Sequence, residues 1–281
     1  MHIPDLSIPA ALAARPRSWY PHAVSDYRRS GFSLLNEVDL PEYRARLLHL
    51  RHEASGLEHV HISNEDPERV FAFCLPSIPD NSHGTPHILE HLVLCGSRNY
   101  PVKDPFLMML AGSPHSFMNA MTFPDRTLYP AASALDADLE NIFRVYLDAV
   151  YFPRLEYGAF LQEGFRYDGH SEGSAAPGGV VFNEMSGVFS DPESVAHEAL
   201  HAFLQPETIY AHVAGGHPRA IPAVTIDELR SFHQRYYQPS LTRSFTYGTL
   251  DVGKYLAILN EQVLRSEEHT SELQSHAPIS Y

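Results

Sequence analysis

Two histidines and a glutamate stand close together in one short segment. His87, Glu90 and His91 belong to the run His-Ile-Leu-Glu-His. On a helix, side chains four positions apart lie one turn apart on the same face, and a side chain three positions on points to that face as well. This spacing lets two imidazoles hold one Zn²⁺ ion while the carboxylate takes a proton from the zinc-bound water. The segment therefore predicts a zinc site with His87 and His91 as ligands and Glu90 as general base.

A catalytic zinc site also needs a third protein ligand and one position left open for water. Two downstream carboxylates are candidates. Glu184 follows an apolar stretch at the start of an expected helix over 180–187, and Glu163 lies in an expected helical stretch over 157–166. Glu163 is also suited to hydrogen-bond a zinc-binding histidine and to orient its ring without binding the metal itself. The residues by themselves leave both assignments open.

The elements that must position these residues form a mixed α+β pattern. The zinc motif falls in an expected helix over 84–94, with Thr85 as N-cap and Pro86 in the first turn. Apolar residues repeat at helical spacing over 134–150, which predicts an amphipathic helix. Segments 57–62 and 69–75 read as two strands, and the turn residues between them predict a β-hairpin.

Further elements follow from the same kind of pattern. A helix over 225–237 opens with Thr225 and has Glu228 three residues on, the signature of a capping box. A polar, glycine-containing segment over 171–179 predicts a loop. The remaining expected elements are helices over 104–111, 194–204 and 252–264 and strands over 117–122, 126–131 and 243–250.

The chain divides into three parts by composition. Residues 1–33 predict an irregular N-terminal extension rich in Pro, Arg and Tyr, and 34–264 a regular catalytic domain. In 265–281 the helical period stops, and 265–276 resembles the in-frame translation of a sequencing-library adapter. We therefore expect 265–281 to be a non-native tail that is excluded from the fold. The natural protein is expected to continue beyond Leu264.

Composition excludes several classes of function. The formal net charge of −14 argues against a nucleic-acid partner, because phosphate binding needs a surplus of Lys and Arg. No run of 18 apolar residues occurs, so no membrane span or membrane partner is expected. The two cysteines, Cys74 and Cys95, do not make a disulfide framework. A reducing compartment follows, with the cytoplasm as the expected location and the mitochondrial matrix as the alternative.

Several motifs together resemble one known family. Segment 84–97, Gly-Thr-Pro-His-Ile-Leu-Glu-His-Leu-Val-Leu-Cys-Gly-Ser, resembles the zinc helix of the pitrilysin/insulinase metallopeptidases, and most closely their presequence-protease branch. The resemblance runs over about 32–264 in the right order. It also includes the segments 117–122, 127–130, 180–187 and 232–240.

The resemblance implies a fold and a set of roles. The expected fold is the pitrilysin/insulinase-type α+β roll, a largely antiparallel sheet covered by helices, present here as the first of four repeats. It implies that His87, His91 and Glu184 bind zinc and that Glu90 is the general base. Asn119 and Ala120 would lie on a strand that pairs with the substrate backbone.

The expected function is that of a zinc-dependent metallopeptidase acting on short unfolded peptides. In the family, the C-terminal half of the chain supplies chamber walls and groups that bind substrate, so a fragment without it is expected to be weakly active or inactive. Two alternatives stay open: a catalytically silent structural or processing-complex relative, and a structural zinc protein with a fourth protein ligand. His197 and His201 also stand four apart, but without a third ligand they read as helix-surface residues.

Overall fold

The computed structural model describes residues 26–169 and 175–265. Most of the expected N-terminal extension and nearly all of the expected tail, residues 266–281, therefore lie outside the described residues. The first elements of the described residues are a short 3₁₀ helix, Tyr27–Ser30, and strand β1, Phe32–Leu40, which starts two residues before the expected start of the domain. No helix in the described ranges is both long and apolar enough to cross a membrane.

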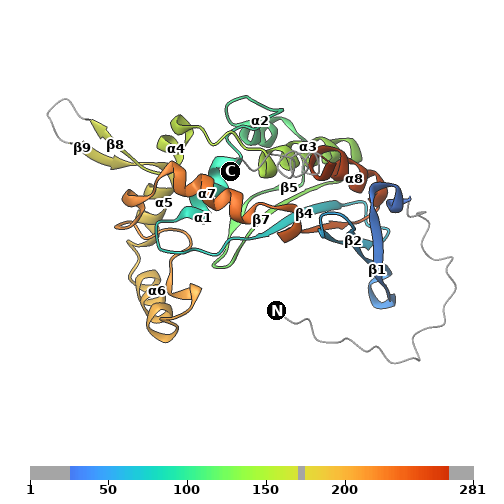
Figure 1. The fold of residues 1–281 in the computed structure, drawn as a ribbon, viewed down its shortest axis with the longest axis horizontal. Helices are drawn as coiled ribbons and strands as arrows, with labels where there is room; N and C mark the ends of the chain where they lie inside the picture. The colour runs from blue at the N-terminus through green and yellow to red at the C-terminus, as the bar shows by residue number, and fades with distance from the viewer. Residues whose placement is uncertain (1–25, 170–174, 266–281) are drawn as a thin grey trace, which may run out of the picture.

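The domain is built on an eight-stranded sheet (Figure 1). Its strand order is β1-β2-β3-β10-β4-β7-β5, with β6 paired to β7, and every pairing is antiparallel except β3 with β10. The prediction of a largely antiparallel sheet is confirmed. The other strands are β2 (Ala45–His52), β3 (Glu58–Ser63), β4 (Arg69–Pro76), β5 (Phe117–Met118), β6 (Met121–Thr122), β7 (Arg126–Ser133) and β10 (Arg243–Tyr247).

Helices cover the sheet and carry the chemistry-bearing residues. Rings from strand and helix interlock in the core: Phe71 of β4 packs edge-on against Phe143 of α3 at 5.0 Å, and Phe143 in turn against Tyr255 of α8 at 5.0 Å. Such edge-to-face pairs add to the energy of burial. The helices are α1 (Thr85–Val93), α2 (Pro105–Gly112), α3 (Asp136–Tyr151), α4 (Tyr157–Glu163), α5 (Val180–Val188), α6 (Pro192–Leu204), α7 (Ile226–Tyr236) and α8 (Val252–Leu259). The α+β class is thereby confirmed.

The expected hairpin of β3 and β4 is wrong, although both strands exist. β10 lies between them, parallel to β3 and antiparallel to β4. Neighbouring strands in sequence usually pair, but here a segment about 170 residues further along the chain supplies the middle strand. The last strand of the domain therefore lies in the middle of the sheet.

A second difference concerns residues 166–178. Helix α4 ends at Glu163, and Arg166–Gly169 (β8) pairs with Ala175–Gly178 (β9) in a small antiparallel ribbon. The expected loop over 171–179 is thus partly strand, while 170–174 lie outside the described residues. Figure 1 shows this ribbon projecting from the body of the domain beside α5. A Cβ on Gly179 would stand 2.2 Å from the carbonyl oxygen of Gly164, so the base of the ribbon requires glycine.

The inward face of β3 is polar. His59 and His61 point into the core, whereas Val60 and Ile62 are half-buried on the other face. The two imidazoles find partners on the adjacent strand: His59 contacts Ser244 Oγ at 2.8 Å and Thr246 Oγ1 at 2.9 Å, and His61 contacts Thr246 Oγ1 at 2.9 Å. Buried polar groups are tolerated when they are hydrogen-bonded in this way.

These histidines make the fold sensitive to acid. Burial, reinforced for His59 by the nearby His61, lowers the pKa of His59 to about 3, and burial lowers the pKa of His61 to about 4. Both pKa values are depressed in the folded state. The stability that the two neutral histidines contribute is therefore fully present above the unfolded pKa near 6.5. It is lost as pH falls from there through the folded pKa, which is about 4 for His61 and about 3 for His59. At pH 5, each neutral histidine costs about 2 kcal/mol of folding free energy relative to neutral pH.

We expect His59→Gln to flatten this pH dependence. The free energy of unfolding, measured by urea titration at pH 7.5 and pH 5, should differ between the two pH values by about 2 kcal/mol less in the variant than in the wild type. His212→Gln, at a half-buried site outside the core, is the matched control and should leave the difference unchanged. Equal pH dependence in His59→Gln and the wild type would show that His59 does not stay neutral in the folded chain.

Candidate metal centre

Helix α1 carries the His-x-x-Glu-His segment and begins where two glycine backbones meet. Its N-cap is Gly84, with φ of 77°, and Pro86 lies in the first turn. A Cβ on Gly84 would stand 2.8 Å from Cα of Gly216, so this contact and the left-handed backbone both require glycine. The expected N-cap at Thr85 is wrong. The Thr85 hydroxyl instead donates to Glu228 of α7 at 2.7 Å.

Glu228 ties the start of α1 to α7. Its carboxylate also accepts from Asn81 at 3.2 Å and contacts His83 Nδ1 at 3.1 Å. Burial would raise the pKa of Glu228, but the hydrogen bonds from Thr85, His83 and Asn81 outweigh it and lower the pKa. Only half of the expected capping box forms. Thr225 caps the Glu228 N–H at 3.2 Å, while the Glu228 side chain serves α1 instead of its own helix.

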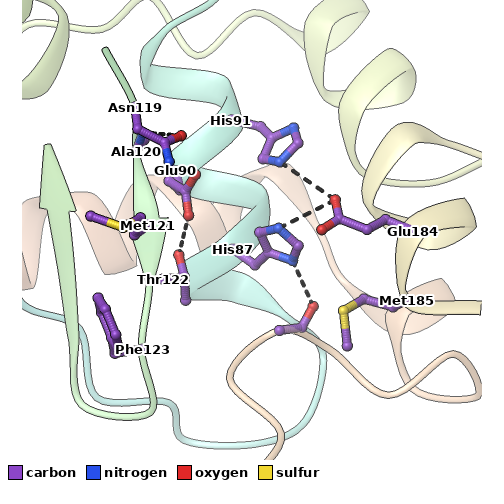
Figure 2. A pocket seen from close by; sticks show the side chains of 11 residues that line it. His87, Glu90, His91, Asn119, Ala120, Met121, Thr122, Phe123, Glu184 and Met185 are labelled. Atoms are coloured by element: carbon purple, nitrogen blue, oxygen red, sulfur yellow. Dashed lines mark hydrogen bonds and ion pairs between the residues drawn. The ribbon is translucent and has the colours of Figure 1, made fainter. Parts of the chain in front are cut away.

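Three side chains converge above α1 (Figure 2). Glu184 Oε2, from α5, lies 3.6 Å from His87 Nε2 and 4.0 Å from His91 Nε2. One ligand atom from each of the three residues falls within 4.8 Å of the others, so the cluster could hold a metal ion. Two imidazole nitrogens and a carboxylate oxygen are a donor set typical of a catalytic zinc site.

The other ring nitrogen of each histidine faces a hydrogen-bond acceptor. His87 Nδ1 lies 3.1 Å from the carbonyl oxygen of Gly215, and His91 Nδ1 lies 3.1 Å from Glu163 Oε2. Because a carbonyl or carboxylate oxygen only accepts, each Nδ1 must carry the proton. The Nε2 atoms of the two rings are directed toward Glu184, an arrangement that favours a cation between the three groups.

The charged groups around His91 also favour positive charge at this site. Burial lowers the pKa of His91, but the hydrogen bond to Glu163 and the charges of Glu90, Glu163 and Glu184 outweigh burial and raise it. Burial raises the pKa of Glu163, and the hydrogen bonds from His91 and Gln162 outweigh it, so the pKa of Glu163 is lowered. The cluster is therefore a site where negative charge gathers around imidazole, which attracts positive charge.

Glu90 lies on the same helix but reaches a different neighbour. It is buried, and its Oε2 accepts a hydrogen bond of 2.5 Å from the Thr122 hydroxyl of β6. Figure 2 shows the Glu90 carboxylate on the strand side of the two histidines, with Glu184 on the other side. The carboxylate is therefore held beside the cluster without being part of it.

His87, Glu90, His91 and Glu184 open into one pocket of about 610 Å³. Its floor is α1, and its walls come from the β5–β6 edge, from α5 and from the loop at Gly215. The lining residues are His87, Glu90, His91, Asn119, Ala120, Met121, Thr122, Phe123, Glu184, Met185 and Gly215. Polar and apolar side chains thus share the wall, as in pockets that bind small molecules.

Asn119 and Ala120 line this pocket, but they do not continue a strand. They form the break between β5 and β6, where Asn119 N–H donates to the Pro130 carbonyl at 3.2 Å and the Ala120 N–H is capped by the Asn119 side chain at 3.0 Å. β5 is the last strand in the sheet order. The segment is thus an interrupted sheet edge facing the pocket.

Five pocket residues were not anticipated from the sequence: Met121, Thr122, Phe123, Met185 and Gly215. Thr122 stands two residues after Ala120, in the segment 117–122 that resembles the family. A polar contact from this segment to the zinc motif could therefore have been predicted from the sequence. Gly215 contributes only its backbone carbonyl, which leaves no signature in side-chain types. Glu163 does lie next to the cluster, on the outer nitrogen of His91.

Comparison with known proteins relates this geometry to a family. A sequence profile described as Insulinase (Peptidase family M16) matches residues 77–164. Presequence protease 1, chloroplastic/mitochondrial, of Arabidopsis thaliana is 42% identical over 255 residues, which cover 89% of this chain and 24% of that protein. Protein HypA of Clostridium perfringens is 42% identical, covering 85% and 25%, and the mitochondrial presequence protease of Drosophila melanogaster is 41% identical, covering 84% and 23%.

A solved structure supports the fold independently. The crystal structure of pitrilysin aligns with a TM-score of 0.66 at 20% identity, covering 84% of this chain and 24% of that chain. Fold and site together thus define a pitrilysin-type α+β domain with a potential metal centre. The chain is similar to the insulinase family of peptidases, family M16, over residues 77–164, and to presequence proteases over most of its own length. It spans about a quarter of the length of the curated relatives it matches.

Proposed function

We propose that this domain is the catalytic part of a zinc-dependent peptidase that hydrolyses short unfolded peptides. The observation that carries the proposal is the convergence of His87 Nε2, His91 Nε2 and the Glu184 carboxylate in an open pocket, with the Glu90 carboxylate beside them. The family and the names of the relatives support a peptidase role.

The donor set fits zinc. His87, His91 and Glu184 would hold the ion, and the acceptors on both Nδ1 atoms keep the two Nε2 lone pairs available for it. Only three protein groups converge among the described residues, which suits a catalytic site better than a structural one with four ligands. When bound, zinc would supply a Lewis acid that polarises a peptide carbonyl and lowers the pKa of water.

The residues of the chain would supply the proton transfers and the orientation. Glu90 would accept a proton from the attacking water and pass it on to the departing amine. Thr122 would fix the Glu90 carboxylate through its short hydrogen bond, so that little reorganisation is needed. The interrupted edge at Asn119 and Ala120 would bind substrate backbone by strand addition once the substrate replaces the Asn119 side chain at the Ala120 N–H, a mode that favours extended chains.

The active protein would need more than this domain. Because the matched relatives are about four times as long as the aligned part, we propose that 34–264 is the N-terminal catalytic domain, the first of four repeats, and that its natural partner is the remainder of its own chain. A pocket open on one side exposes the reaction to water, and groups from the remainder would close it. The relatives named for mitochondria or chloroplasts favour the matrix alternative over the cytoplasm for the location.

The test compares residues 1–264 with the full-length parent on a fluorogenic unfolded peptide. We expect one zinc per chain in both, robust cleavage by the parent and little or none by 1–264 alone. Zinc without cleavage by the parent would indicate a silent or structural role and overturn the proposal. Efficient cleavage by 1–264 would overturn the requirement for the missing half.

A further inference from the structure

A second histidine pair lies outside the pocket, on α6. His197 and His201 stand four residues apart on this helix, as His87 and His91 do on α1. Their ring centroids are 4.4 Å apart, compared with 5.0 Å for the pair in the pocket. Residue type, spacing and ring approach are therefore alike in the two pairs, although only one of them has a carboxylate over it.

The ring nitrogens of the two histidines on α6 are available to bind a ligand. His197 is exposed and His201 half-buried. Within the described residues, neither ring makes a hydrogen bond or an ion pair, and each contacts the other ring. In this they differ from the histidines of the pocket and of the core, whose ring nitrogens are engaged. A neutral imidazole without another acceptor or donor can offer a lone pair to a metal.

The helix that carries the pair is well formed. α6 has 13 residues, Pro192 lies in its first turn, and the Asp191 side chain caps Ser194 N–H at 2.9 Å. The cap and the proline fix the start of the helix, so the two side chains are held one turn apart before any ligand arrives. The net charge of −14 raises the local concentration of cations around the surface.

We propose that His197 and His201 form a second metal site, which binds a divalent transition-metal cation through two imidazoles, with solvent completing the coordination. Imidazole is a good ligand for Zn²⁺, Ni²⁺ and Cu²⁺, and Cu²⁺ binds most tightly of the three. With two protein ligands instead of three, the site is weaker and more exchangeable than the pocket cluster. It fills when free metal exceeds the amount that loads the cluster, and it does not depend on the peptidase proposal.

The test uses the full chain carrying Glu184→Gln as the background, with Ni²⁺ as the probe. Glu184 is exposed, and its substitution weakens metal binding by the pocket cluster. Three proteins are compared by calorimetric titration: this background, the background with His201→Ala, and the background with His197→Ala plus Ala196→His. The last keeps the number of histidines but moves the pair to a spacing of five, which turns the rings apart on the helix. Ala196 is exposed, and circular dichroism checks that each variant is folded.

The expected result is an affinity for Ni²⁺ at least about tenfold weaker in both variants than in the background, because the second imidazole no longer binds intramolecularly. Equal affinity in all three proteins would overturn the proposal, since histidines elsewhere in the chain would then account for the binding. Weakening by His201→Ala but not by the respaced variant would also overturn it, because a chelating pair requires the spacing of four.

Discussion

Replacing Glu90 by Gln is expected to abolish peptide hydrolysis by the full-length parent while leaving its zinc content unchanged. Gln keeps the size of the side chain but cannot accept and carry the proton of the attacking water, and loss of a general base costs about 10²- to 10⁴-fold in rate. Zinc should stay because Glu90 faces Thr122 on the strand side of the two histidines, away from Glu184. The measurements are kcat on an unfolded peptide and metal content by elemental analysis.

Three further variants test whether the effect is specific to Glu90 and to the hydroxyl that holds it. Glu207→Gln, an exposed carboxylate on a loop, is the matched control and should leave kcat unchanged. Thr122→Val removes the hydroxyl that holds Glu90 and is expected to lower kcat by about tenfold, whereas Thr122→Ser should retain most of the activity. Near-normal turnover by Glu90→Gln would remove Glu90 from the mechanism, and loss of zinc in that variant would make it a ligand.

Replacing Glu184 by Gln is expected to weaken zinc binding by about a hundredfold or more. Structural zinc sites with four protein ligands bind with about 10–16 kcal/mol, so each ligand contributes roughly 3 kcal/mol, or about a hundredfold in the dissociation constant. The Glu184 side chain is 52% exposed, so the substitution is not expected to unfold the domain. Competition with a chromophoric chelator measures the affinity, and urea unfolding of the metal-free protein checks the fold.

Glu163→Gln is the matched comparison, because the two carboxylates differ in which nitrogen they face. Glu163 contacts His91 Nδ1 and would act by orienting the ring, a contribution of about 10- to 100-fold. We therefore expect a smaller loss of affinity than in Glu184→Gln. The opposite order, with Glu163→Gln losing zinc and Glu184→Gln retaining it, would make Glu163 the third ligand.

Local sequence was enough to predict most elements. The helices over 134–150, 194–204 and 225–237 agree with α3, α6 and α7 to within two residues at each end, because apolar spacing and caps act over a few residues. The pairing of the strands could not be predicted from local sequence. β10 separates β3 from β4, and that choice depends on contacts between segments nearly 200 residues apart in sequence.

The inward face of β3 shows the same limit. Its alternation was readable, but histidine is more often exposed than buried, and only the hydroxyls of Ser244 and Thr246 on a distant strand make His59 and His61 acceptable in the core. The half-formed capping box at Thr225 is a similar case. The Glu228 carboxylate accepts a hydrogen bond from Thr85 at the start of α1 instead of capping its own helix.

For the metal centre, the sequence by itself determined that His87, Glu90 and His91 share one helical face, because that follows from the period of the helix. It did not determine which carboxylate completes the cluster, since Glu163 and Glu184 both stand on helices within about 100 residues of the motif. Tertiary packing of α4 and α5 decided that Glu184 faces the two Nε2 atoms and that Glu163 faces the outer nitrogen of His91. The physical reason is that distances of 3 to 4 Å between side chains are set by how helices pack, which short-range spacing along the chain does not encode.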